Sequence, residues 1–130
     1  MTTDLAQHYR DYLAALDARR LDDLDRFVAD EVVHDDRAMT RAGYRALLEE
    51  DVRLIPDLRY DLQELVVEGT SVAARLWFDC TPVADFRGLA TAGRRVRFAE
   101  HAFYRFTDGR ITRVRSVVDL AAVRRQVSRS

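Results

Sequence analysis

The C-terminal half of the chain contains the stretch that decides the fold. It reads RVRFAEHAFYRF over residues 95–106, TDGR over 107–110 and ITRVRSVVD over 111–119. Two runs rich in β-branched and aromatic residues are joined here by Asp108-Gly109, a dipeptide that favours a tight two-residue turn. We therefore predict an antiparallel hairpin, preceded by the Gly-bounded turn FRG at residues 86–88.

Outside this hairpin, the first half of the chain has the apolar periodicity of helices and the second half that of strands. We expect helices over residues 4–19 (with Thr3 or Asp4 as the cap), 21–28, 40–54 and 120–127. We expect strands over 58–67, 71–81, 95–106 and 111–118, a short extended run over 30–35 and a loop or short irregular strand over 83–93. This order predicts an α+β fold with helices packed on one face of the sheet. The length of 130 residues fits one domain, 1–130.

Composition narrows the function classes. The net charge of -1 argues against nucleic-acid or membrane-surface binding, because both need a large basic excess. No run of 18 apolar residues predicts a membrane span, and the N-terminus lacks the apolar stretch of a signal peptide. Cys80 is the only cysteine, which excludes an intramolecular disulfide and fits a cytoplasmic protein.

Alternation along the strands separates an inner from an outer face of the sheet. The inner face of the run 95–106 is apolar except for Glu100; its members are Val96, Phe98, Glu100, Ala102 and Tyr104. The outer face combines aromatic residues with several arginines, a composition typical of an interface, and its candidates for contact are Trp77, His101 and Phe103. The alternative for this face is a solvated surface with scattered aromatic residues.

Glu100 is the first candidate for chemistry. A carboxyl group on an apolar strand face is partly desolvated, which raises its pKa and suits it to general acid or base catalysis. The alternative is a structural Glu paired with a buried Arg or a helix N-terminus. A register slip of one residue would instead turn His101 inward.

His34 is the second candidate, within VVHDD at residues 32–36. Histidine transfers protons near neutral pH, and Asp35 or Asp36 could orient its ring. The alternative is a surface histidine in an acidic loop. No metal site is expected, because His8, His34 and His101 lie on different predicted elements without ligand spacing.

Tyrosines are candidate cavity residues, because each offers an apolar ring and one hydroxyl donor. We predict Tyr12 as a donor to a substrate oxygen. The predicted substrate-binding residues are Tyr9, Leu16, Tyr44, Leu48, Tyr60, Phe78, Phe98, Ala102, Tyr104, Ser116 and Val118.

The order of several short sequence segments resembles that found in one protein family. VVHD, GYRALL, PDLR, EGTSVAAR, FRG and the final hairpin follow one another as in SnoaL-like polyketide cyclases of the nuclear transport factor 2-like superfamily, which are similar to ketosteroid isomerase. The resemblance implies a cone-shaped fold, with N-terminal helices packed on a curved antiparallel or mixed sheet around one pocket. It also implies a homodimer through the outer sheet face, and Tyr12 as the counterpart of a first-helix donor.

The resemblance leaves the reaction open. Ketosteroid isomerase implies an acidic group at Asp35 or Asp36 and a second one where this chain has Ala102. The SnoaL-type cyclases imply a carboxylate where this chain has Ser116 and a histidine where it has Ala102. Glu100 could be a relocated acid. The first hypothesis is therefore a cofactor-free cyclase, isomerase, dehydratase or epoxide hydrolase that acts on a small hydrophobic carbonyl or polyketide-like substrate. For epoxide opening, Asp61 or Glu64 could join Asp36. The alternatives are a binding module without catalysis and a structural dimer.

Overall fold

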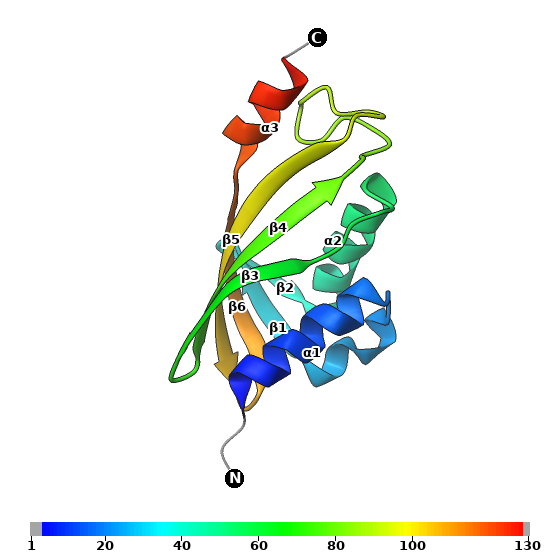
Figure 1. Ribbon diagram of the computed structural model, residues 1–130. Coiled ribbons are helices and arrows are strands. Elements are labelled where there is room, and N and C mark those ends of the chain that lie inside the picture. Colours follow the sequence, from blue (N-terminus) through cyan, green and yellow to red (C-terminus); the bar gives the residue numbers. More distant parts are fainter. Residues whose placement is uncertain (1–3, 129–130) are drawn as a thin grey trace.

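The computed structural model describes residues 4–128 of the chain (Figure 1). Its elements in chain order are α1 (Leu5–Asp17), the 3₁₀ helix η1 (Leu21–Arg26), β1 (Val28–His34), β2 (Arg37–Thr40), α2 (Arg41–Leu54), β3 (Asp61–Glu68), β4 (Ser71–Cys80), β5 (Val96–Thr107), β6 (Arg110–Val118) and α3 (Leu120–Val127). The predicted α+β class is confirmed.

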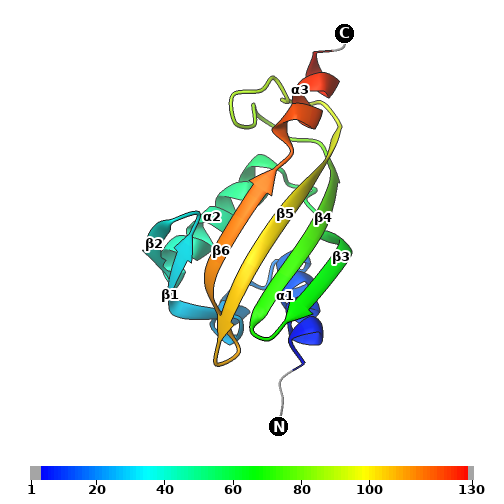
Figure 2. The same cartoon turned by 90° about the vertical axis from the view of Figure 1, so that its left-hand side faces the viewer.

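The six strands form one mixed sheet in the order β2-β1-β6-β5-β4-β3. Strands β3 to β6 are the expected antiparallel meander, whereas β1 pairs in parallel with β6. The sheet is curved, and α1 and α2 lie on its concave side (Figure 1). In Figure 2 the opposite face of β3 to β6 is turned toward the viewer. This arrangement is the cone that the sequence led us to expect.

Two-residue turns connect two strand pairs. Asp108 and Gly109 both have positive φ angles, +51° and +78°, as the predicted tight hairpin requires. Asp35 and Asp36, at +46° and +68°, form a similar turn between β1 and β2. We did not predict β2, because its four residues are too few to show a strand period and Asp-Asp is a weaker turn signal than Asp-Gly.

Two other boundaries differ from the predictions. The second helix is a 3₁₀ helix that ends at Arg26, so Val28 already belongs to β1. Strand β3 begins at Asp61 rather than at residue 58. The reason is tertiary: the amide of Tyr60 donates to the Asp17 carboxylate, and the carbonyl of Leu58 accepts from Arg19, so these groups bind α1 and its end.

Side-chain caps fix the starts of the helices. Asp4 accepts a hydrogen bond from the Gln7 amide and Thr40 accepts one from the Gly43 amide. Asp4 is therefore the cap of α1, and Thr3 lies outside the described residues. No helix in the range 4–128 is long and apolar enough to cross a membrane.

The predicted faces of the strands are confirmed. In β5 the side chains of Val96, Phe98, Ala102 and Tyr104 are buried and Glu100 on the same face is partly buried, while the residues of the other face are exposed, with one exception. Ala99 is buried although it belongs to the outer set; it lies opposite Trp77 in the β4–β5 register. Helices α1 and α2 cover the inner face and, together with the strands, form one hydrophobic core.

Candidate active site

A cavity of about 140 Å³ lies between α1, α2 and the inner face of the sheet. The walls combine apolar and aromatic side chains with polar groups, and the polar groups come from α1, β1, α2, β5, β6 and two loops. The lining residues are Tyr12, Leu13, Leu16, His34, Tyr44, Leu47, Leu48, Asp51, Tyr60, Leu76, Arg87, Glu100, Ala102, Tyr104, Val114 and Ser116. An apolar cavity with a few convergent polar groups is the usual form of a small-molecule site.

A second, smaller cavity of about 50 Å³ adjoins the first. The two share Asp51, Tyr60, Arg87 and Glu100. The smaller cavity is otherwise apolar, with Ile55, Leu58, Phe78, Phe86, Phe98 and Val118 in its wall. Two carboxyl groups and one guanidinium therefore meet where an apolar recess opens into the larger cavity.

Glu100 lies on the inner face of β5, where strand alternation places it beside Phe98 and Ala102. Burial raises the pKa of its carboxyl group to about 7; the nearby Asp51 also raises it, and Arg87 partly offsets both effects. Within residues 4–128 Glu100 forms no ion pair within 4.0 Å, and a hydrogen bond from the Ser116 side chain lowers its pKa by less than burial raises it. A carboxyl group that titrates near neutral pH can both accept and return a proton.

Asp51 lines both cavities, although it was not among the residues predicted from the sequence. It lies on α2, seven residues after Tyr44 and three after Leu48, and so on the same helix face. Its side chain is exposed at the rim of the cavity. Desolvation by the surrounding protein nevertheless raises its pKa to about 6, and the positive charge of Arg87 only partly offsets this rise. The signal was available: an Asp interrupts the apolar stripe that runs from Tyr44 to Ile55.

Four tyrosines form two hydroxyl pairs in and beneath the cavity. The Tyr12 and Tyr44 hydroxyls lie 2.7 Å apart, and the Tyr9 hydroxyl donates to that of Tyr104 over 3.2 Å. Burial raises the pKa of all four, so they keep their protons. Tyr12, our predicted donor, thus shares its hydroxyl with Tyr44, and one proton of the pair remains for a ligand.

His34 lies at the cavity wall, and its Nδ1 is 3.7 Å from the Asp35 carboxylate. Asp35 in turn accepts a hydrogen bond from the backbone amide of Ser116, which fixes its position against β6. Asp36 points elsewhere: its side chain is exposed and lies 3.6 Å from Arg115. Of the two candidate aspartates, the structure brings Asp35 and not Asp36 to the cavity side.

The remaining predicted residues divide into three groups. The cavities bring together Leu16, Tyr44, Leu48, Tyr60, Phe78, Phe98, Ala102, Tyr104, Ser116 and Val118. Tyr9 lies beneath the cavity in the core and does not line it, because its ring packs on Tyr104. Asp61 and Glu64 are exposed on β3, away from both cavities.

The outer face has the residues that the sequence placed there. His101 is exposed and lies 2.7 Å from the Arg75 guanidinium, so no register slip brings it inward. Phe103 is 60% exposed and Val117 is 69% exposed. Residues 4–128 contain no group of three His, Cys, Asp or Glu side chains that could hold a metal ion.

Comparisons with known proteins show the family of this chain. The family model for the SnoaL-like polyketide cyclase matches residues 6–127. The chain belongs to this family. A SnoaL-like polyketide cyclase from Agrobacterium tumefaciens strain C58 has 46% sequence identity and a TM-score of 0.94; the match covers 97% of this chain and 98% of that one. A search of curated proteins found no match.

More distant structures share the fold of this SnoaL-like protein. TsrD from Streptomyces laurentii has 26% identity and a TM-score of 0.85, with 98% of each chain covered. IdmH from Streptomyces antibioticus has 20% identity and a TM-score of 0.83, with 97% of this chain and 99% of that one covered. These likenesses support the architecture, whereas the reaction has to be argued from the site.

Proposed function

We propose that this SnoaL-like protein is a cofactor-free acid–base enzyme for a small hydrophobic carbonyl or polyketide-like substrate. The observation that carries the proposal is Glu100: its carboxyl group is partly buried, has a pKa raised to about 7 by desolvation, and lies where the two cavities meet. Proton abstraction next to a carbonyl needs a base that is ionised near neutral pH yet is not fully hydrated. The polyketide cyclase from Agrobacterium, at 46% identity, makes a carbonyl-rich substrate the first choice.

The step begins with the Glu100 carboxylate removing a proton from the carbon beside a substrate carbonyl. The electron pair of the C–H bond moves into a new C–C double bond, and the negative charge moves to the carbonyl oxygen. The Tyr44 or Tyr12 hydroxyl can donate a hydrogen bond to that oxygen, because one proton of this pair is free. The enolate then takes the proton back at another carbon, or it attacks a second carbonyl and Glu100 protonates the new alkoxide.

His34 with Asp35 supplies a second proton-transfer group in this proposal. The ring lies at the wall of the larger cavity and next to Tyr44, with a distance of 5.9 Å between ring centroids. His34 could exchange a proton with a substrate group near Tyr44, while Glu100 does so with a group near β5. The larger cavity, at about 140 Å³, suits a group the size of one benzene ring. A longer substrate would extend out between Leu47 and Arg87, which are exposed at the rim.

A binding module without catalysis is the second candidate. Ala102 and Ser116 favour it, because they occupy cavity positions where the family resemblance implies acidic groups. Glu100 and Asp51 favour the enzyme, because both carboxyl groups have raised pKa values and line the same cavities. Two carboxyl groups with different environments are a common way to provide an acid and a base.

We also propose a homodimer through the outer sheet face. Phe103, Val66 and Val117 are at least 60% exposed there, and Trp77 and His101 lie on the same face. A cytoplasmic location is proposed on the single, buried Cys80. Neither proposal is needed for the chemistry at Glu100.

The test is an exchange assay that does not need the natural substrate. Aromatic ketones and β-diketones are incubated with protein in deuterated water, and the loss of the α-proton signal is followed by NMR. We expect the wild-type protein to accelerate exchange of at least one compound by roughly 100-fold or more over Glu100→Gln, the usual range for a positioned base. Equal rates for the two proteins, with binding retained, would favour the binding module.

A further inference from the structure

The loop between β4 and β5 contains a miniature hairpin that presents one arginine. Phe86 and Leu89 exchange backbone hydrogen bonds of 3.2 Å and 2.9 Å across the corner residues Arg87 and Gly88. Both corner residues have positive φ angles, +50° and +78°. This geometry resembles the Asp108-Gly109 turn, but an arginine stands where such turns favour Asn, Asp or Gly.

The backbone of Arg87 is therefore held in an unfavourable conformation. A residue with a Cβ atom in the left-handed region crowds the adjacent carbonyl, and Arg has no short side chain to compensate by local hydrogen bonding. Strain of this kind persists only where the surroundings impose it, and it is commonly found at functional positions. At this strained turn the candidate functional group is the side chain of Arg87.

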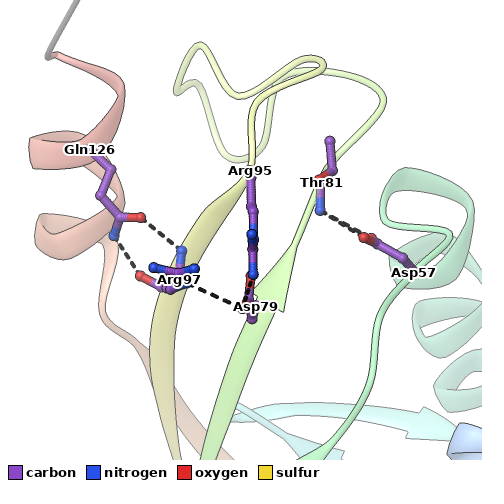
Figure 3. Close-up of polar contacts among 6 residues, drawn as sticks. All are labelled: Asp57, Asp79, Thr81, Arg95, Arg97 and Gln126. Carbon is purple, nitrogen blue, oxygen red and sulfur yellow. Dashed lines mark hydrogen bonds and ion pairs between the residues drawn. The ribbon is translucent and has the colours of Figure 1, made fainter.

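The loop is fixed from inside and at both ends. The fully buried Thr91 hydroxyl accepts from the Phe86 amide over 2.9 Å and donates to the Ala84 carbonyl over 3.0 Å. At the start of the loop Asp57 binds the Thr81 amide, and at its end Asp79 binds the Arg95 guanidinium through two hydrogen bonds of 2.8 Å (Figure 3). The position of Arg87 is thus built into the fold.

Arg87 is directed to the junction of the two cavities, because it lines both. Its guanidinium carbon lies 5.3 Å from the centroid of the Phe86 ring, which itself packs on Phe98 in the cavity wall. The charge of Arg87 acts on Asp51 and on Glu100, yet no ion pair within 4.0 Å joins them among residues 4–128. Its donors are therefore available to a ligand.

We propose that Arg87 is a further catalytic residue, which binds the oxygen that becomes negatively charged when Glu100 removes the substrate proton. This inference rests on the proposed function. During that step one negative charge leaves the Glu100 carboxylate and reaches the enolate oxygen, so the total charge beside the guanidinium is unchanged. Among residues 4–128 no ion pair ties the Arg87 guanidinium to Glu100, so the guanidinium can lie closer to the enolate oxygen than to the carboxylate. It then stabilises the negative charge more after the proton transfer than before it. The ligand class is thus a neutral carbonyl compound whose enolate is bound as an anion.

The experiment uses para-nitrophenol, whose phenolate imitates an enolate and absorbs visible light, and para-nitroanisole, which has the same ring but cannot ionise. Both are titrated into wild type, Arg87→Asn, Arg87→Lys and Asp108→Asn. The last variant is a matched control, because it places Asn at the same turn position far from the cavities. We expect wild type and Asp108→Asn to bind the probe as phenolate, and Arg87→Asn to bind it about tenfold or more weakly.

The pattern across the variants decides the proposal. Arg87→Lys should recover part of the phenolate affinity, para-nitroanisole should bind all four proteins alike, and Arg87→Asn should melt no lower than wild type because Asn suits the turn. Phenolate binding that is unchanged in Arg87→Asn would overturn the role of Arg87 and leave Glu100 and the tyrosines in place. A wild-type protein that binds neither probe would overturn this inference and the proposed function together.

Discussion

The hydroxyl groups of Tyr12 and Tyr44 lie 2.7 Å apart in the wall of the cavity, which joins α1 to α2 through side chains alone. Both side chains are almost fully buried, so within the protein each hydroxyl depends on the other for a hydrogen bond. The pair therefore has a structural role as well as a proposed role in the reaction.

Removing both hydroxyls of this pair should destabilise the protein by less than the sum of the two single removals. Tyr12→Phe or Tyr44→Phe leaves a buried hydroxyl without its partner, and we expect each to lower the free energy of unfolding by about 1–2 kcal/mol. The double variant should fall well short of the sum. Urea unfolding of the four proteins gives the coupling free energy. Additive losses would show that the two hydroxyls act independently.

Stability should fall with pH because of Glu100. Its pKa rises on folding from the ordinary 4.5 to about 7, so the native state binds the proton more tightly than the unfolded state. The contribution is present below about pH 4.5 and is lost as pH rises through 7. The loss is on the order of 3 kcal/mol at 1.36 kcal/mol per pKa unit. Glu100→Gln should therefore gain stability relative to wild type between pH 5 and pH 8. Parallel pH profiles of the two proteins would contradict the raised pKa.

Charge changes at the cavity junction should move the pKa of Glu100 in opposite directions. Asp51→Asn removes a negative neighbour and should lower it, whereas Arg87→Asn removes a positive neighbour and should raise it. Carbon-13 NMR of Glu-labelled protein measures both, with Glu100→Gln to assign the signal. Asp36→Asn is the matched control, because Asp36 is exposed and lies beside Arg115 instead. Shifts of the same sign in Asp51→Asn and Arg87→Asn would refute the arrangement.

The outer sheet face can be tested by its oligomeric state. Phe103→Arg replaces the exposed aromatic side chain of the outer face, which lies between Ala73 of β4 and Arg115 of β6, with a charge. If this face joins two copies, the variant should be monomeric in light-scattering measurements while keeping the circular dichroism of wild type. Val83→Arg, at an equally exposed site on the β4–β5 loop, should have no effect. A Phe103→Arg protein with the wild-type mass would place any dimer elsewhere.

The Thr91 hydroxyl should stabilise the β4–β5 loop, so its loss should loosen the loop before the sheet. Thr91→Val keeps the shape but removes both hydrogen bonds of a fully buried hydroxyl, and we expect a loss of about 1–3 kcal/mol in unfolding free energy. Amide exchange should rise first around Phe86 and Leu89. Thr70→Val, on an exposed turn, changes the same atoms without consequence. Equal stability of the two variants would mean that the loop is held by other contacts.

Much of the fold could be predicted from the sequence because its signals are local. Asp108-Gly109 fixed the hairpin, Thr40 and Asp4 marked helix starts, and the period-two pattern from Val96 to Tyr104 assigned the two faces of β5. The predictions failed where an element is very short or where a tertiary contact sets its boundary. Strand β2 has four residues, and β3 begins late because α1 binds the backbone of residues 58–60.

The sequence by itself determined that Glu100 faces the helices, because side-chain alternation is a property of one strand. Only the tertiary structure decided its neighbours. Asp51 comes from a helix and Arg87 from a loop, and nothing in local spacing states that their charges act on the same carboxyl group. The same is true of Tyr12 and Tyr44, which are 32 residues apart in the chain. Such long-range contacts arise from how helices pack on a curved sheet, and the packing depends on all the buried side chains at once.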